Sequence, residues 1–371
     1  MVSKFPLSLY IHIPWCEKKC PYCDFNVTTN IPNNFSNFSK ALISDIEASS
    51  EWIQNRKFSS IYFGGGTPSL ADPSLHESII KWLTKNHLAQ SDIEITLECN
   101  PKETNLQNLN RFMDIGINRF SLGIQSFDEG VLKDLGRNHT YKESYKAIEE
   151  LEKISSRKTI DLMYGCPNQT LEKAAKDIVV FSKSNIKHLS YYQLTLEPNT
   201  VFYSKSPKLP SEEEIEAIES ACKDILNNKL FSQYEVSSWS RGNDLSSHNL
   251  NYWNYGDYLG IGPGSHSKIS IEEKSIRFTK LKKVSSYIED QAPKLMQSIE
   301  GKELDMEIAM NFFRLKNGPD VEKIKTYLQL SNEFLNKCKN AQKEGLLLRD
   351  CLLYTSPSPR DLSTSRMPSS A

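Results

Sequence analysis

Three thiols lie within the eight residues Cys16-Glu17-Lys18-Lys19-Cys20-Pro21-Tyr22-Cys23. These residues follow directly on the apolar run 7–13, Leu-Ser-Leu-Tyr-Ile-His-Ile, which predicts a β-strand. Thiolates are the protein ligands of iron–sulfur clusters, and a tight loop with this spacing supplies three of them. A cubane cluster has four irons, so one iron is left without a protein thiolate and can chelate a small molecule. We therefore predict a [4Fe–4S] cluster on the loop that leaves this strand, with Cys16, Cys20 and Cys23 as its ligands.

A structural zinc site is the main alternative, because zinc takes four ligands and His12 would supply the fourth. It is less favoured, since His12 lies inside the predicted strand, where closed zinc sites are rarely built. A disulfide is also less favoured, because the start of the chain shows no signal peptide and thiols stay reduced in the cytosol. We interpret the remaining cysteines as small buried apolar residues: Cys99, Cys166, Cys222, Cys338 and Cys351.

The bulk properties exclude some classes of protein. A length of 371 residues suggests two domains, or one barrel with an appendage. The balance of 45 basic against 46 acidic residues gives no reason to expect nucleic-acid binding. No apolar run approaches the length of a membrane span, although peripheral membrane contact is left open. We expect a cytoplasmic protein, because a reducing compartment suits an oxygen-sensitive cluster.

Short apolar runs alternate with longer amphipathic runs through the first half of the chain. Six runs predict strands: Leu7–Ile13, Ser60–Phe63, Ile93–Glu98, Arg119–Ile124, Thr159–Met163 and His188–Leu194. Helical patterns lie between them, at about 35–56, 73–88, 104–115, 141–155 and 170–184. This alternation predicts an α/β fold, a partial (β/α)6 barrel resembling the TIM barrel, with its chemistry at the C-terminal ends of the strands. A doubly wound open sheet is less favoured, because special residues follow nearly every strand rather than one switch point.

A glycine-rich run, Gly64-Gly65-Gly66-Thr67-Pro68, follows the second predicted strand. Three glycines let the backbone approach a ligand closely and offer amide groups to it. A plain turn is the alternative, since a run of glycines alone is a weak signal. The position after a strand, downstream of the cysteine triplet, favours a ligand-binding loop.

Polar side chains follow the later strands as well: Glu98, Gln125, Arg137 and Asp161. Each alone is ordinary, because a lone Gln or Asp near a strand end is most often a cap or turn residue. Together they surround one opening beside the glycine-rich run. An arginine suits a carboxylate, which it can bind with two hydrogen bonds, and acidic and amide side chains suit ribose hydroxyls.

We divide the chain into four parts. Residues 1–240 form the barrel. Residues 241–280 form a linker region with a second group of glycines, at 260–264, that lacks the spacing of a dinucleotide-binding loop. Residues 281–350, with helical patterns that include Pro319–Leu328, predict a small, mainly helical, winged-helix-like domain. Residues 351–371 hold six serines and three prolines, so we expect a disordered, non-native tail and a truncated C-terminal domain.

Residues 5–350 resemble the oxygen-independent coproporphyrinogen III oxidase family of radical S-adenosylmethionine (SAM) proteins. The resemblance rests on Tyr10-Ile11-His12-Ile13-Pro14-Trp15-Cys16, on the glycine-rich run at 64–68 and on Leu135-Gly136-Arg137. It implies that SAM binds the open iron of the cluster, where electron transfer cleaves its sulfonium to a 5′-deoxyadenosyl radical. It also implies a SAM site lined by Tyr10, Tyr22, Gly65, Gly66, Thr67, Glu98, Gln125, Arg137 and Asp161, with Thr195 and His266 as further ligand contacts.

Two branches of this family differ near the cluster. The oxidase branch has a fourth cysteine two residues after the third and an N-terminal extension, whereas here that position is Phe25 and nine residues precede Tyr10. The residues His248-Asn249-x-x-Tyr252-Trp253 resemble the signature of the other branch, the haem chaperones called HemW. A neutral imidazole can ligate haem iron, and Tyr and Trp can form a wall for a porphyrin. A turn cap is the alternative role for His248.

The resemblance therefore implies a haem chaperone that binds haem, a [4Fe–4S] cluster and SAM, and that passes haem to an acceptor protein. A flavodoxin or ferredoxin would supply the electron. The alternative is coproporphyrinogen III oxidase of porphyrin biosynthesis, so the sequence leaves open whether the chain is an enzyme.

Overall fold

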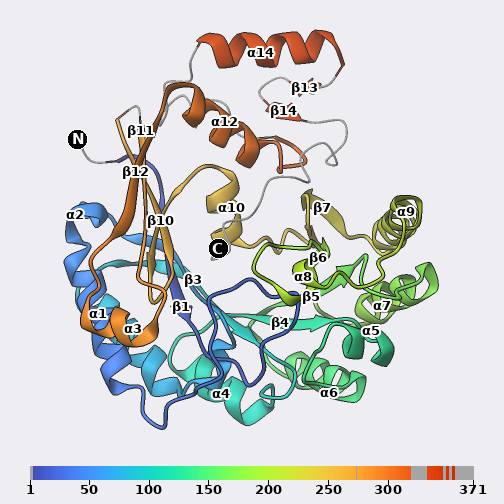
Figure 1. The fold of residues 1–371 in the computed structure, drawn as a ribbon, viewed down its shortest axis with the longest axis horizontal. Coiled ribbons are helices and arrows are strands. Elements are labelled where there is room, and N and C mark those ends of the chain that lie inside the picture. The colour runs from blue at the N-terminus through green and yellow to red at the C-terminus, as the bar shows by residue number, and fades with distance from the viewer. Residues whose placement is uncertain (1–2, 273, 319–331, 346–347, 351–352, 356–371) are drawn as a thin grey trace.

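The computed structural model describes residues 3–272, 274–318, 332–345, 348–350 and 353–355. Its centre is six parallel strands in sequential order, as the sequence predicts. They are β1 (Leu7–Ile13), β2 (Phe58–Gly65), β3 (Ala89–Cys99), β4 (Arg119–Gln125), β5 (Arg157–Tyr164) and β6 (His188–Gln193). The sheet curls without closing, so the prediction of a partial barrel is confirmed (Figure 1).

Helices connect the parallel strands and cover the outside of the sheet (Figure 1). They are α1 (Ser36–Ala48), α2 (Ser50–Ile53), α3 (Pro73–Lys85), α4 (Leu106–Asp114), α5 (Glu129–Asp134), α6 (Tyr141–Glu152) and α7 (Leu171–Lys183), with a 3-10 turn at Pro68–Leu70. Local sequence sets where they begin. Thr140 and Glu143 form a capping box at the start of α6, and the Asp72 side chain accepts from Ser74 N–H at the start of α3. The six-residue helix α5 is too short to show an amphipathic pattern, and the sequence does not predict it.

Polar and apolar residues alternate along β1, although all of them are buried. Leu9 and Ile11 belong to the hydrophobic core shared with α1 and α3. Ser8 and Tyr10 point to the other face, where Ser8 shares a hydrogen bond with Ser60 (2.8 Å). Parallel strands covered on both faces are usually apolar throughout. A polar inner face therefore marks the interior of this barrel as the place for ligand chemistry.

The main sheet extends beyond the six parallel strands at both ends. On one side, β9 (Asp257–Ile261) pairs parallel with β1, and β10 (His266–Ile271), β11 (Lys274–Thr279) and β12 (Lys294–Glu300) follow antiparallel. On the other side, β8 (Ser238–Ser240) and β7 (Ser232–Glu235) pair antiparallel beyond β6. The sequence predicts none of these strands. For β9 and β10 the reason is that glycines lie within β9 and in the turn between the two strands, so the sequence predicts a linker there.

The remaining elements are mainly helical. They are α8 (Val201–Ser204), α9 (Glu212–Asn228), α10 (Ser247–Trp253), α11 (Val284–Glu289), α12 (Gly301–Phe312) and α14 (Asn332–Lys343), with a hairpin of β13 (Leu348–Asp350) and β14 (Leu353–Thr355). The helix predicted at 319–328 and most of the tail predicted at 351–371 lie outside the described residues. The four-part division of the chain stays a prediction.

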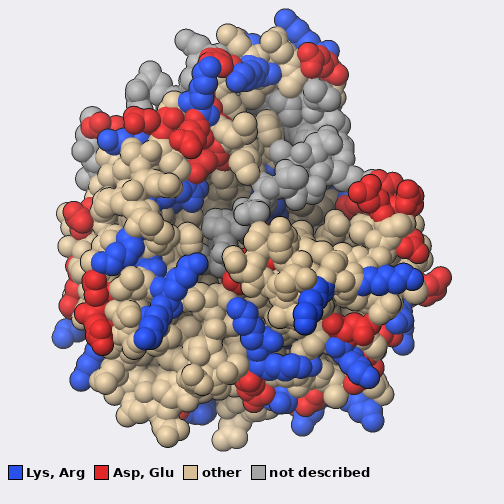
Figure 2. All heavy atoms as spheres, viewed as in Figure 1, with Lys and Arg blue, Asp and Glu red and all other residues tan. Residues whose placement is uncertain are grey.

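Two further properties agree with the composition. Within the described ranges, no helix is both long and apolar enough to cross a bilayer. On the face drawn in Figure 2, basic and acidic side chains are interspersed, in keeping with a formal net charge of −1.

Candidate functional site

The three clustered cysteines lie on the loop that leaves β1 at its C-terminal end. Cys16 N–H donates to Thr28 O (3.1 Å) and Cys23 N–H donates to Cys20 O (3.1 Å), so the loop folds back on itself. Their side chains are half-buried, whereas the other described cysteines are buried: Cys99, Cys166, Cys222 and Cys338. Burial raises the pKa of Cys16 to about 11 and that of Cys23 to about 12, so a bound metal must displace their protons.

The side chain that would complete a zinc site at this loop already has partners of its own. His12, the fourth ligand of the zinc alternative, shares a hydrogen bond with Tyr10 OH (3.1 Å) and another with the backbone oxygen of Asn26 (2.8 Å). Neither ring nitrogen is therefore free.

The glycine-rich loop, residues 64–68, begins with the last two residues of β2 and packs directly against the cysteine loop. Gly66 N–H donates to Ile13 O (2.8 Å), and Thr67 N–H donates to Trp15 O (2.7 Å). A Cβ atom on Gly66 would stand 2.5 Å from Trp15 O and 3.0 Å from Cys16 Sγ, which is too close for any side chain. The glycine is therefore required by the approach of these two loops, and the backbone next to it lies beside a predicted cluster ligand.

Glu98 lies at the C-terminal end of β3 under the same glycine-rich loop. One carboxylate oxygen accepts from Tyr62 OH (2.9 Å) and the other from Gly65 N–H (3.0 Å). Burial raises the pKa of Glu98 to about 7. A cationic ligand would favour the ionised form, so this carboxylate is suited to a positively charged group.

Arg137 lies in the loop after α5, and its side chain contacts the cysteine loop. Its Nη2 donates to Gly123 O (2.7 Å), while Nη1 lies 3.8 Å from Cys20 Sγ and 3.5 Å from Tyr22 OH. The Nε of Arg137 is buried and has no hydrogen-bond partner among the described residues. The next glycine before it, Gly136, has φ +67°, and a Cβ there would be 2.6 Å from Pro21 Cδ. Because the same guanidinium lies beside Cys20 Sγ, an anionic group bound there would satisfy the unpartnered Nε.

The other predicted SAM-site residues lie at the same end of the barrel or close to it. Gln125, in the left-handed region with φ 72°, accepts from Tyr192 OH through its side-chain oxygen (2.7 Å). Asp161 accepts from Ser121 OH (2.9 Å), and burial raises its pKa. Thr195 is exposed after β6.

Some residues that hold this site are not predicted from the sequence. Glu17 in the cysteine loop accepts from Lys102 Nζ (2.8 Å) and from Asn138 Nδ2 (3.0 Å), which ties the loop to segments after β3 and α5. Asn26 donates through Nδ2 to Pro263 O (2.8 Å) and Lys282 O (2.8 Å). These residues are polar loop positions with no motif around them, so no sequence signal marks them.

The residues 248–253 lie elsewhere, in α10, beneath the barrel interior. His248, Tyr252 and Trp253 are buried, with Tyr252 and Trp253 in a cluster with Tyr258 and Leu315. His248 uses both ring nitrogens, one with Ser60 OH (2.9 Å) and the other with Tyr252 OH (2.8 Å). The prediction that these residues bind haem therefore receives no support from the geometry, because no ring nitrogen is open to an iron.

Arg137→Lys is expected to weaken SAM binding while the cluster stays in place. Lysine keeps the positive charge but lacks the planar guanidinium. In Arg137 this group donates to Gly123 O through Nη2 and leaves Nε free for a ligand. The loss is about 1–3 kcal/mol, the scale of a hydrogen bond to a charged group. Calorimetry with the reconstituted protein measures it, and unchanged SAM affinity would count against a role for Arg137 in the site.

Comparisons with known proteins agree with this geometry. The model of the radical SAM superfamily matches residues 10–178, which span β1 to α7. Among solved structures, coproporphyrinogen III oxidase (HemN) from Escherichia coli superimposes with a TM-score of 0.76 at 21% identity, over 95% of this chain and 86% of that one. At this identity the likeness concerns the fold.

Several curated relatives are similar over most of the chain. "Heme chaperone HemW" of Buchnera aphidicola (from Acyrthosiphon pisum) is 38% identical over 353 residues, which is 93% of each chain. "Heme chaperone HemW" of Escherichia coli K12 is 37% identical over 328 residues, 87% of this chain and 86% of the relative. The chain therefore belongs to the radical SAM superfamily and, within it, to the family whose members carry the name heme chaperone HemW.

Proposed function

We propose that this protein is a haem chaperone, which binds haem and passes it to an acceptor protein. The observation that carries this proposal is its similarity, at 37–38% identity, to proteins named heme chaperone HemW over 87–93% of its length. The site at the barrel mouth supports it, because the cysteine loop, the glycine-rich loop and Arg137 come together there. We expect the protein to work in the cytoplasm, where its thiols stay reduced.

Cys16, Cys20 and Cys23 would hold the [4Fe–4S] cluster, and Glu98, Arg137 and the glycine-rich loop would hold SAM. The residues fit such a group, since the thiols are half-buried at the mouth and a buried Arg137 donor there lacks a partner. When bound, SAM and the reduced cluster would supply a 5′-deoxyadenosyl radical. The chain's own part is to orient the ligand with Glu98 and Arg137, and a flavodoxin or ferredoxin would provide the electron.

His266 is the better candidate for the axial ligand of haem iron. It begins β10, lies close enough to His12 to lower that residue's pKa, and is half-buried. Among the described residues its ring makes no hydrogen bond or ion pair, in contrast to the ring of His248. Burial, aided by Arg277 and Lys282, lowers the pKa of His266, so its imidazole is neutral at physiological pH. Neutral imidazole is the form that ligates iron.

The alternative is a coproporphyrinogen III oxidase. The fold likeness to HemN leaves this open, because at 21% identity it concerns the fold alone. Phe25 stands where the oxidase branch has its fourth cysteine, and this favours the chaperone.

His266→Ala is expected to lose most of the Soret shift that haem produces on titration of the anaerobically purified protein. Without an imidazole ligand to its iron, haem would be held by apolar contacts of the porphyrin alone. The cluster absorbance should stay, because His266 is not a cysteine-loop residue. His87→Asn serves as the control, since His87 is exposed and has φ 55°, a conformation that asparagine tolerates.

The same sample decides between the two functions. The chaperone is expected to bind haem and to leave coproporphyrinogen unchanged. Conversion of coproporphyrinogen to protoporphyrinogen by the wild type, without haem uptake, would overturn the proposal in favour of the oxidase. An equal Soret shift in wild type and His266→Ala would remove His266 as the ligand and leave the chaperone assignment standing.

A further inference from the structure

A chain of side-chain contacts runs from α10, at the floor of the barrel, to the glycine-rich loop at its mouth. It passes through His248, Tyr62 and Glu98, which come from three different elements, α10, β2 and β3. The floor end contains the residues 248–253 that lie far from the cysteine loop. The mouth end contains the backbone that we propose holds SAM.

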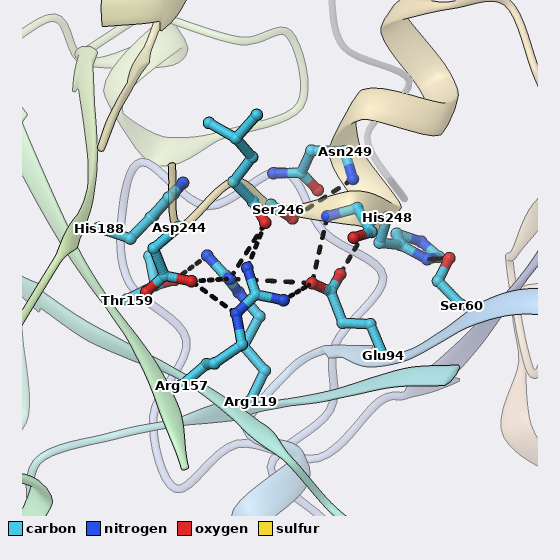
Figure 3. Close-up of polar contacts among 12 residues, drawn as sticks. Ser60, Glu94, Arg119, Arg157, Thr159, His188, Asp244, Ser246, His248 and Asn249 are labelled. Atoms are coloured by element: carbon cyan, nitrogen blue, oxygen red, sulfur yellow. Dashed lines mark hydrogen bonds and ion pairs between the residues drawn. The ribbon is translucent and has the colours of Figure 1, made fainter. Parts of the chain in front are cut away.

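A carboxylate of the barrel fixes the start of α10. Glu94 of β3 accepts from the backbone N–H of His248 (2.9 Å) and of Ser247 (3.2 Å), as Figure 3 shows for His248. Two arginines hold Glu94 in turn, with Arg157 Nη1 at 2.7 Å and Arg119 Nη1 at 3.8 Å. Breaking such a buried ion pair is costly because it strands a charge. The backbone of His248 is therefore fixed to β3.

The ring of His248 is fixed just as firmly. Its nitrogens are bonded to Ser60 OH and Tyr252 OH, and burial lowers its pKa to about 3, so the ring stays neutral. It stacks on the ring of Tyr62, with centroids 4.9 Å apart and planes 30° from parallel. Because both nitrogens of the His248 ring are bonded and the site is closely packed, this ring gives the stacked ring of Tyr62 one preferred orientation.

Tyr62 transmits this orientation to the mouth. Its hydroxyl donates to Glu98 (2.9 Å), and the second oxygen of Glu98 accepts from Gly65 N–H (3.0 Å). The Tyr62 ring also lies under the loop, since a Cβ on Gly64 would be 2.9 Å from its edge. The ring of Tyr62 contacts Gly64 directly, and its hydroxyl reaches Gly65 through Glu98, so a displaced Tyr62 would move both glycines together with Glu98.

We propose that His248 is a positioning residue for the SAM site, acting through Tyr62 on Glu98 and the glycine-rich loop. The inference rests on the proposed SAM site and gives the residues 248–253 a role other than haem binding. His248 touches no ligand in this role. Its substitution should therefore change SAM affinity and leave haem binding unchanged.

The test compares SAM affinity among variants of the full-length, cluster-loaded protein by calorimetry. His248→Ala removes the stacked ring, and Tyr62→Phe removes only the hydroxyl that Glu98 accepts from. Each is expected to weaken SAM binding by about tenfold, as for one hydrogen bond to a charged group. The double variant should lose little more than either single one, because both act along one route. His248→Phe restores a ring against Tyr62 and should recover part of the loss.

His188→Ala is the matched control. His188 is as buried as His248 (1% exposed each), and its ring shares a hydrogen bond with Tyr234 OH (2.8 Å), but it has no recorded contact with Tyr62 or Glu98. It should lower the melting temperature without changing SAM affinity. A purely structural role of His248 predicts that both histidine variants behave alike.

Distinct outcomes separate the two proposals. Wild-type SAM affinity in both His248→Ala and Tyr62→Phe would overturn the positioning role and leave the proposed function intact, as would an equal loss in His188→Ala. A wild type that binds haem but no SAM would overturn the SAM site and this inference with it. Loss of haem uptake in His248→Ala at unchanged SAM affinity would return His248 to haem binding.

Discussion

Cys20→Ala is expected to abolish the broad visible absorbance of the reconstituted protein together with its bound iron and sulfide. Three thiolates are the complete set that this loop offers, so the loss of one leaves two irons without a protein ligand. The variant also removes the sulfur that lies 3.8 Å from Arg137 Nη1 and strands that guanidinium next to an empty position. Anaerobic reconstitution followed by spectroscopy and by iron and sulfide analysis measures the effect.

Cys222→Ala is the control for this experiment. Cys222 is buried in α9 within the hydrophobic core, so its loss removes a thiol but no predicted ligand. The iron and sulfide content of Cys222→Ala should equal that of the wild type. Full iron and sulfide content in Cys20→Ala would show that the cluster assignment is wrong.

A second large effect is expected for Gly66→Ala, which should lose most of its SAM affinity. The added Cβ would stand 2.5 Å from Trp15 O, a backbone atom that also accepts from Thr67 N–H (2.7 Å) and cannot turn away. The glycine-rich loop or the cysteine loop must therefore move. Overpacking of this kind costs about 1–3 kcal/mol, up to roughly a hundredfold in affinity. Calorimetry with SAM and the iron content of the same sample measure the two effects separately.

Gly130→Ala provides the comparison. Gly130 lies in α5, where an added Cβ would be 3.1 Å from a carboxylate oxygen of Asp128. Alanine is also a better helix former than glycine. Its SAM affinity should match that of the wild type. If Gly66→Ala also binds SAM normally, the glycine-rich loop does not approach the ligand as we propose.

The six parallel strands and the position of the cysteine loop are predictable from the sequence because they depend on local patterns. Alternation within β1 and the amphipathic pattern of α3 each fit within a dozen residues or so. The order of parallel strands then places every strand's C-terminal end on one edge. For this reason the sequence predicts Glu98 and Gln125 at one edge although they are far apart in it, whereas Arg137 follows α5 and is predicted from the family resemblance.

The strands β9 and β10 are not predictable in this way, because distant contacts determine them. A Cβ on Gly262 would be 2.5 Å from His12 O, and one on Gly260 would clash with His266 O. These glycines allow strands to approach closely, while in the sequence they indicate a loop. Pattern alone shows that glycine is present but not which backbone lies against it.

His248 shows a different limit. A histidine within a short polar motif is compatible with a ligand, a cap or a buried support, and the choice depends on its burial. The structure places it at 1% exposure with both nitrogens bonded, and the partner Ser60 lies 188 positions earlier in the chain. Such a contact leaves no local trace in the sequence.

The two hydrogen bonds of the Asn26 side chain have a consequence for biosynthesis. They join the cysteine loop to residues 237 and 256 positions further along, and β9 pairs with β1 across a similar separation. Contacts this distant form late, because the intervening chain must be made and brought round first. On the ribosome, the cysteine loop therefore reaches its final form only after Lys282 has emerged. We therefore expect the predicted cluster to be inserted only after residues 256 positions beyond Asn26 have been made.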